Sequence, residues 1–197
     1  MTPEMRQRLN RVRRENPEWE SWVGLLETAL DAMEKGSAWE AAVPAPPAVS
    51  AAVPWLHGAR IRLDGRVARR WVRSLLKRAR GGRETPISSL GRLKSRSVDA
   101  LGLLEAAVRQ EDEEIDELAR QADAEPEALR VVAQIAALPL LQACGRAREA
   151  REDGRPADWA EGYCPVCGAW PALAEFRGIE RKRWLRCGRC GAGWEVT

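Results

Sequence analysis

The sequence predicts a mainly α-helical protein that ends in a small metal-binding hairpin. Apolar residues recur at helical spacing through most of residues 1–155, whereas two CxxCG units dominate the segment that follows. We therefore expect an irregular helical domain over residues 1–155 and a four-cysteine ribbon over residues 156–197.

Composition and charge exclude several classes of protein. The 197 residues are 45% hydrophobic and 31% charged, which is typical of a folded domain and not of a disordered chain. The formal net charge is only +3, so the overall charge gives no case for nucleic acid or an anionic membrane as a partner. No stretch approaches the roughly 18 consecutive apolar residues of a membrane helix.

The N-terminal residues also exclude export. Arg13-Arg14 could be taken for a twin-arginine signal, but the next residues are polar and no apolar segment follows. We therefore expect a cytoplasmic protein, in which paired cysteines bind metal and do not form disulfides.

Two helices are expected within residues 1–36. Asn16-Pro17 predicts the break between them, with Asn16 as the N-cap and Pro17 at the first helical position. The second helix has an apolar stripe made of Trp19, Trp22, Val23, Leu26, Leu30 and Met33. The Pro- and Ala-rich residues 43–54 predict an extended connection after it.

The next helix is expected to begin after Asp64, as its cap, and to end near Ala79. Its buried face comprises Ala68, Trp71, Val72, Leu75, Leu76 and Ala79. Its other faces are basic, with Arg66, Arg69, Arg70, Arg73, Lys77, Arg78 and Arg80. Such a helix can touch phosphates or an acidic partner, but we interpret it as a solvated face because no aromatic residues interleave with the charges.

Helical spacing resumes near Ser97, and the acidic run at residues 111–114 is interpreted as a solvated helix surface. A last long helix is expected from Pro126, with a kink at Pro139. Its apolar side contains Leu129, Val132, Ala136, Leu140, Ala143 and Ala147. Cys144 lies on that side and is interpreted as a small core residue; Gly154–Pro156 predicts a linker.

The predicted metal ligands are Cys164, Cys167, Cys187 and Cys190. A CxxC turn lets two sulfurs point at one ion, and the glycine that follows each pair permits the tight backbone turn. Between the pairs, Ala172–Phe176 and Lys182–Arg186 predict a hairpin, and Trp194–Val196 predicts a short third strand. The arrangement is that of a zinc ribbon with a rubredoxin-like hairpin.

We expect one zinc ion per chain, with iron as the alternative, because both metals accept four thiolates. The protein supplies all four ligands, so no position is open for water and zinc here is structural; no catalytic residue is predicted. A ribbon of this size buries too little surface to fold alone, so the metal should hold it together.

The ribbon contains four tryptophans, Trp159, Trp170, Trp184 and Trp194. Some of them should pack under the hairpin, and any that stay exposed would favour a protein-binding surface over a DNA-binding one. Basic and acidic residues nearly balance in the ribbon, which argues against phosphate binding despite the local patch Arg181-Lys182-Arg183.

These motifs resemble a known family. CPVCGAWPALAE and RWLRCGRCGAGWEV resemble the first metal-knuckle segment of the formate dehydrogenase accessory protein (FdhE) family. The upstream segments PWLHGARIRLDGRVARRWVRSLL and ALPLLQACGRAR are similar to it as well, so the resemblance covers about residues 15 to 197. The family usually continues with a further CxxC set and a second ribbon, whereas this sequence ends at Thr197, so only one metal site is carried over.

The resemblance implies a cytoplasmic maturation factor, a chaperone-like protein. Such proteins associate with the catalytic subunit of a molybdenum- or tungsten-dependent formate dehydrogenase and help it become active, while the formate chemistry stays with that subunit. The resemblance does not identify the partner-binding residues of this chain.

Two other functions remain open. A nucleic-acid-binding zinc ribbon protein would use Arg181-Lys182-Arg183 and the basic helix from Arg66. An enzyme is not expected, because His57 has no Ser or Cys partner motif and the sequence has no phosphate-binding loop or dinucleotide fingerprint. Iron in the four-cysteine site would permit electron transfer.

Overall fold

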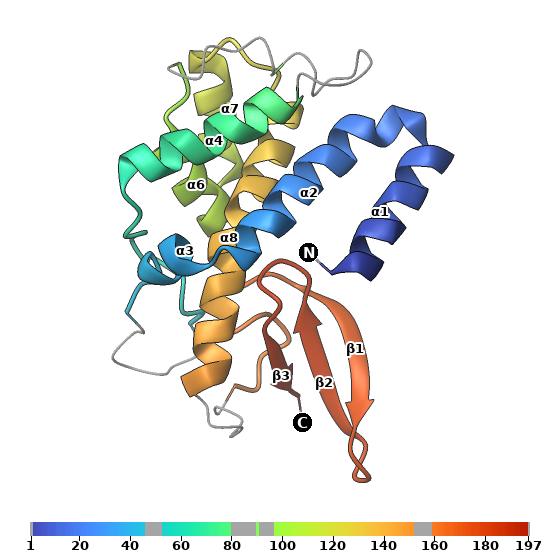
Figure 1. Cartoon of the computed structure of the whole chain (residues 1–197). Helices are drawn as coiled ribbons and strands as arrows, with labels where there is room; N and C mark the ends of the chain where they lie inside the picture. Colours follow the sequence, from blue (N-terminus) through green and yellow to red (C-terminus); the bar gives the residue numbers. More distant parts are fainter. Residues whose placement is uncertain (1, 46–52, 80–89, 91–96, 152–158, 197) are drawn as a thin grey trace. The chain divides into compact units, whose positions relative to one another are not determined.

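A computed structural model describes residues 2–45, 53–79, 90, 97–151 and 159–196. It confirms a mainly helical chain with a small C-terminal antiparallel sheet (Figure 1). The chain divides into two compact units, one formed by residues 1–36 and 63–139 and the other by residues 37–62 and 140–197. The predicted division at residue 155 does not coincide with this one, because the ribbon shares its unit with residues 37–62 and with the last part of a helix.

The first unit is helical. It contains α1 (Pro3–Glu15), the 3-10 turn η1 (Pro17–Trp19), α2 (Glu20–Glu34), α4 (Gly65–Ala79), α6 (Ala100–Arg109), α7 (Asp112–Gln121) and the part of α8 (Pro126–Arg151) up to Pro139. Its core is built mostly of leucine and alanine; the largest fully buried side chains include Leu25, Leu75, Leu103, Leu104 and Leu129.

The break at Asn16-Pro17 is confirmed, but Asn16 acts differently from the prediction. Its side chain makes no capping bond to the following turn and instead donates from Nδ2 to the Val12 carbonyl at 3.2 Å, at the end of α1. Of the stripe predicted for α2, only Val23 is buried, and the helix also buries Leu25 and Ala29. The stripe is therefore confirmed only in part: Trp22, Leu26, Leu30 and Met33 are half-buried and Trp19 is exposed. The reason is that α2 packs on neighbours that the periodicity of one helix does not identify.

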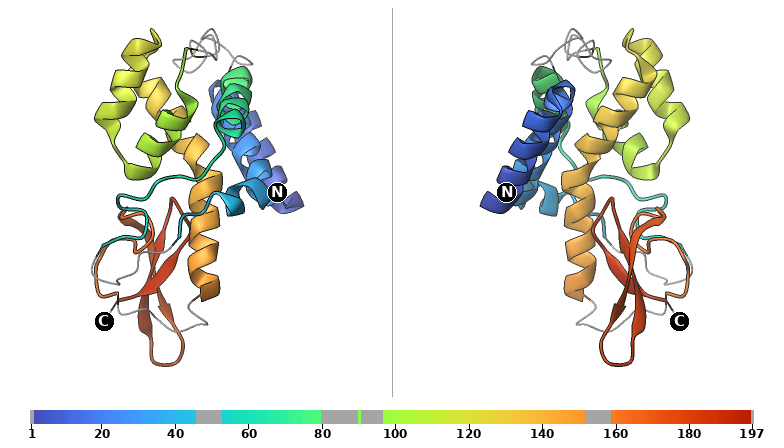
Figure 2. Two further views of the ribbon diagram at one scale, coloured as in Figure 1. Left: turned by 90° about the vertical axis from the view of Figure 1, so that its left-hand side faces the viewer. Right: turned by 90° about the vertical axis from the view of Figure 1, so that its right-hand side faces the viewer.

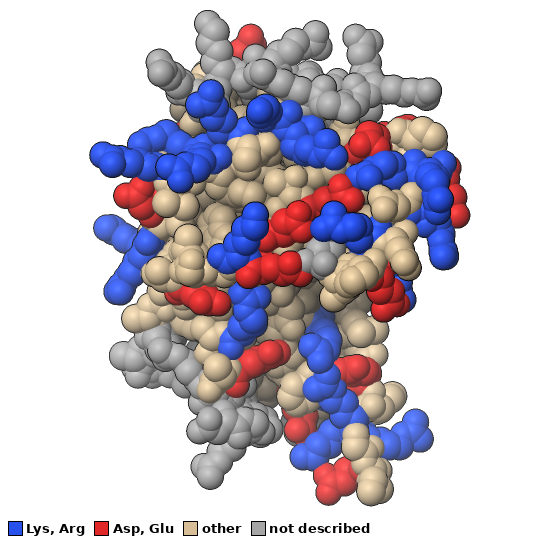
Figure 3. All heavy atoms as spheres, viewed as in Figure 1, with Lys and Arg blue, Asp and Glu red and all other residues tan. Residues whose placement is uncertain are grey.

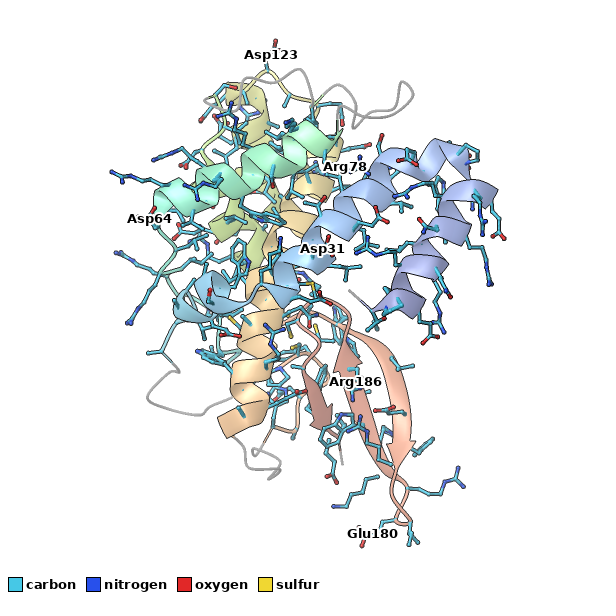
Figure 4. The ribbon with its side chains drawn as sticks, in the orientation of Figure 1. Asp31, Asp64, Arg78, Asp123, Glu180 and Arg186 are labelled. Atoms are coloured by element: carbon cyan, nitrogen blue, oxygen red, sulfur yellow. The ribbon has the colours of Figure 1, made fainter. Side chains whose placement is uncertain are left out.

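The predicted cap, bounds and buried face of α4 are confirmed. Asp64 Oδ1 accepts the amide N–H groups of Arg66 at 2.7 Å and Val67 at 3.3 Å, which caps the helix (Figure 4). All six predicted apolar residues of α4 are buried. Trp71 also donates from Nε1 to the Ala136 carbonyl of α8 at 2.9 Å, so a hydrogen bond joins the two helices inside the core.

Replacing Trp71 with phenylalanine tests that bond. The ring stays apolar but the donor is lost, so we expect the free energy of unfolding to fall by about 1 kcal/mol, with a further loss from the smaller ring. Urea unfolding followed by circular dichroism measures the change. A variant as stable as the parent would show that the bond contributes nothing.

Gln110 separates α6 from α7. Its backbone is left-handed, with φ 62°, so the acidic run lies in a new helix, α7, and not in the continuation of α6. The run is exposed, as predicted. Arg130 of α8 donates from Nε and Nη2 to the two Asp116 carboxylate oxygens of α7 at 2.6 Å each, and this guanidinium lowers the pKa of Asp116.

The helix α8 contributes to both units. It runs through Pro139, and five of its six predicted apolar residues are fully buried or nearly so, namely Leu129, Val132, Ala136, Leu140 and Ala143, while Ala147 is half-buried. By length and composition the segment Pro126–Ala150 qualifies as a membrane span, yet 67% of its most apolar window is buried inside the protein. The core helix of a soluble protein meets the same criteria.

The second unit contains α3 (Ser37–Ala41), which the sequence did not predict, the end of α8 and three strands. The strands β1 (Pro171–Arg177), β2 (Lys182–Cys187) and β3 (Gly193–Glu195) pair antiparallel in the order β1-β2-β3. They confirm the predicted hairpin and third strand, and they lie beside the C-terminal part of α8 (Figure 2). Residues 46–52 of the predicted connection, Arg80 and the predicted linker at residues 154–156 lie outside the described residues.

Candidate metal centre

Two backbone knuckles hold the four predicted ligands. The first spans residues 164–169, just before β1, and the second spans residues 187–192, between β2 and β3. In the first knuckle Gly168 N–H donates to the Cys164 carbonyl at 2.9 Å; in the second Gly191 N–H donates to the Cys187 carbonyl at 3.1 Å. Both glycines have φ 74°, which an L side chain rarely adopts.

Further hydrogen bonds repeat in the two knuckles. Cys164 N–H donates to the Ala169 carbonyl and Cys187 N–H to the Ala192 carbonyl, each at 2.9 Å. The amide two residues after the first cysteine of each pair, Val166 or Arg189, lies 3.4 Å from that cysteine's sulfur. Amide donors of this kind stabilise a thiolate, so the backbone prepares both knuckles to carry negative charge.

The four sulfurs converge on one point. Cys164 Sγ lies 3.4 Å from Cys190 Sγ and Cys167 Sγ lies 3.5 Å from Cys187 Sγ, while all four lie within 4.8 Å of one another. Four sulfurs bound to one zinc at about 2.3 Å would be ~3.8 Å apart. All four cysteines are free and buried. They are therefore placed to hold one metal ion.

The crowding of the thiols sets their protonation. Hydrogen bonding from Cys164 holds the pKa of Cys187 and Cys167 below the usual range, whereas the pKa values of Cys164 and Cys190 are raised because their protons are shared with neighbouring sulfurs. A cation that replaces the shared protons would let all four groups ionise together.

The first knuckle is anchored by the segment that precedes α4. Trp55 N–H donates to the Pro165 carbonyl at 2.9 Å, and Leu56 N–H donates to the Val166 carbonyl at 2.8 Å. Both Trp55 and Leu56 are buried. Two consecutive backbone hydrogen bonds thus fix the loop that presents Cys164 and Cys167.

The second knuckle lies directly against α8. A Cβ atom built on Gly145 would be 2.1 Å from the Cys190 carbonyl oxygen, so only a glycine permits this approach. Gln142, one turn earlier on α8, donates from Nε2 to the Arg189 carbonyl at 3.2 Å. The helix end and the knuckle therefore form one packed structure.

Cys144 is buried next to this contact and is not one of the four clustered ligands. Burial, and to a smaller degree the charge of Cys167, raise the pKa of Cys144 to about 12. The interpretation of Cys144 as a small core residue is therefore confirmed by its burial.

The tryptophans of the ribbon have different environments. Trp194 is buried and donates from Nε1 to the Glu161 carbonyl at 3.0 Å, and Trp184 lies over Gly193, where an added Cβ would be 2.2 Å from the indole nitrogen. Trp170 is 78% exposed, and the hairpin adds Leu173 at 54%, Phe176 at 64% and the fully exposed Ile179. The hairpin therefore presents apolar side chains that the metal knuckles do not use.

The prediction of the four ligands did not include the groups that support them. Gly145, Gln142 and the Trp55-Leu56 backbone had no distinctive motif; a glycine inside a long helix was the one available signal. His57 is exposed, and among the described residues no other group of His, Cys, Asp or Glu side chains could hold a metal ion.

Comparison of the chain with models of protein families, with curated proteins and with solved structures found no match.

Proposed function

We propose that Cys164, Cys167, Cys187 and Cys190 bind one structural zinc ion and that the protein is a non-enzymatic accessory factor of a client redox enzyme. The observation that carries the proposal is a closed site, four buried sulfurs from two equivalent knuckles. A site closed by four protein ligands offers no coordination position to a substrate or a reactive water. Its role is then to shape the ribbon that surrounds it.

The exposed hairpin supports a protein as the partner. Leu173 and Phe176 belong to β1, an edge strand of the sheet, and Trp170 and Ile179 flank that strand. Large exposed apolar side chains next to an unpaired strand edge are typical of protein-binding surfaces. The resemblance to the FdhE family names the client we propose, the catalytic subunit of a cytoplasmic formate dehydrogenase.

Elemental analysis of protein purified without added metal tests the site. We expect one zinc per chain and a colourless protein, because Zn²⁺ has a filled d shell and its thiolate complexes do not absorb visible light. If the analysis instead finds one iron per chain and a visible absorption band, the site would support electron transfer and not a purely structural role.

A pull-down with the formate dehydrogenase catalytic subunit tests the client. We expect the double substitution Leu173→Ser and Phe176→Ser to reduce capture about tenfold or more, because exposed apolar anchors contribute over about 1 kcal/mol each at interfaces. Met5→Ser with Val131→Ser is the matched control, since both side chains are exposed apolar groups outside the hairpin. Equal capture by both variants, or capture no stronger than that of an unrelated metalloenzyme, would contradict the proposal.

A further inference from the structure

The helix α4 has two faces of opposite character. One is apolar and fully packed, and the other contains basic residues and no carboxylate. The exposed basic residues of α4 are Arg66, Arg69, Arg70, Arg73, Lys77 and Arg78. The packed face is held in the core through Trp71, so the basic face points outward.

Five of these residues, from Arg66 to Lys77, form one stripe. Their spacing is i, i+3, i+4, i+7 and i+11, which places them on one side of a helix. At a rise of about 1.5 Å per residue the stripe is ~16 Å long. Figure 3 shows the basic side chains gathered in a band over α4, and we call this band the α4 basic stripe.

The α4 basic stripe is not neutralised. Within the described part of the chain, no carboxylate lies within 4.0 Å of the cationic groups of these five residues, whereas Arg78, the sixth, lies 3.8 Å from Glu20 and 3.9 Å from Glu27. The carboxylate of Asp64, at the start of the helix, accepts hydrogen bonds from the backbone amides of Arg66 and Val67. Five neighbouring like charges repel each other, and an external polyanion would relieve that repulsion.

The chemistry of the stripe separates two kinds of polyanion. A protein interface is typically anchored by buried apolar or aromatic side chains, and none of the large exposed apolar residues of the described chain lies on α4. Binding to nucleic-acid phosphates needs no such anchor, because it is driven by release of condensed counterions. Four of the five residues are arginines, whose guanidinium groups bind phosphate oxygens in pairs.

We infer that the α4 basic stripe binds the phosphate backbone of a nucleic acid without reading its sequence. The stripe carries no Asn, Gln, Asp or Glu side chain that could read adenine or cytosine edges, so we expect its affinity to come mainly from phosphate contacts. The low net charge of +3 does not oppose this inference, because at physiological salt the electrostatic field of a charge is screened within about 8 Å. The charges of the local surface therefore determine whether a polyanion binds there. This activity is separate from the client binding proposed for the hairpin.

Fluorescence anisotropy with a labelled oligonucleotide of mixed sequence, about 20 nucleotides long, tests the inference on the full chain, in single-stranded and duplex form. If five phosphates are neutralised, the logarithm of the duplex binding constant should fall with the logarithm of salt with a slope of about −4.5. The triple variant R69Q/R70Q/R73Q should lower affinity at least about tenfold and reduce the size of that slope by about 3. Glutamine keeps the helix propensity of arginine, so α4 should stay folded.

The matched control is R6Q/R11Q/R14Q, which removes the same charge from exposed arginines of α1. It should change the slope by less than about 1, if the stripe is the binding surface. An equal loss of affinity for the oligonucleotide in both variants would mean that binding follows the net charge of the protein and not the α4 basic stripe, and would overturn the inference. Absence of salt-dependent binding would do the same, as would binding of an acidic polyglutamate peptide more tightly than the oligonucleotide.

Discussion

Replacing Cys187 with serine is expected to lower the metal content from one ion per chain towards zero and to unfold the three-stranded sheet. Cys187 supplies one of four converging sulfurs and also ends β2, so its loss removes a ligand at the point where the sheet meets the site. Structural zinc contributes about 10–16 kcal/mol to the folding of small zinc domains. A ribbon of this size buries too little apolar surface of its own to replace that contribution.

Elemental analysis and tryptophan fluorescence measure the two effects. Trp194, which is 3% exposed, should become solvated and shift its emission to longer wavelength. Cys144→Ala is the matched control, because this buried thiol lies outside the four-sulfur cluster and should leave the metal content at one. A Cys187→Ser protein with full metal content and unchanged emission would refute the metal centre.

Replacing Gly145 with alanine is expected to lower the free energy of unfolding by about 1–3 kcal/mol and to speed removal of metal by a chelator. The added methyl would meet the backbone carbonyl of Cys190 at 2.1 Å, and neither the helix nor the knuckle can turn aside as a flexible side chain could. Urea unfolding and the rate of metal transfer to a coloured chelator measure the two changes.

Gly24→Ala provides the comparison for Gly145. It also adds a methyl inside a helix, but there the nearest atoms are the guanidinium group of Arg78 at 2.6–2.8 Å. The end of an arginine side chain can move, and alanine favours the helix by up to about 1 kcal/mol over glycine, so we expect no loss of stability. If both variants behaved alike, the contact between α8 and the second knuckle would not be close in solution.

The sequence was most informative where one residue type has one structural use. The CxxCG pairs identified the four ligands and the left-handed glycine of each knuckle, because few arrangements other than a metal knuckle need that pattern. The N-cap at Asp64 and the buried face of α4 were also predicted correctly, since a cap and a 3.6-residue period are properties of a single helix.

The sequence was less informative about how elements pack on one another. The apolar stripe of α2 is only partly buried and α3 was missed, because the period of one helix does not say which neighbours will cover it. Gln110 gave no turn signal, although its left-handed backbone ends α6.

The ligands, the hairpin and the exposed charge of α4 could be predicted from the sequence, since all of them depend on local chemistry and spacing. The support of the knuckles by Gly145, Gln142 and the Trp55-Leu56 backbone, and the compact unit that the ribbon shares with the end of α8, became visible only in the folded chain. Each of these contacts joins residues distant in the chain and has a backbone group on at least one side, and because every residue possesses such groups they give no distinctive sequence pattern.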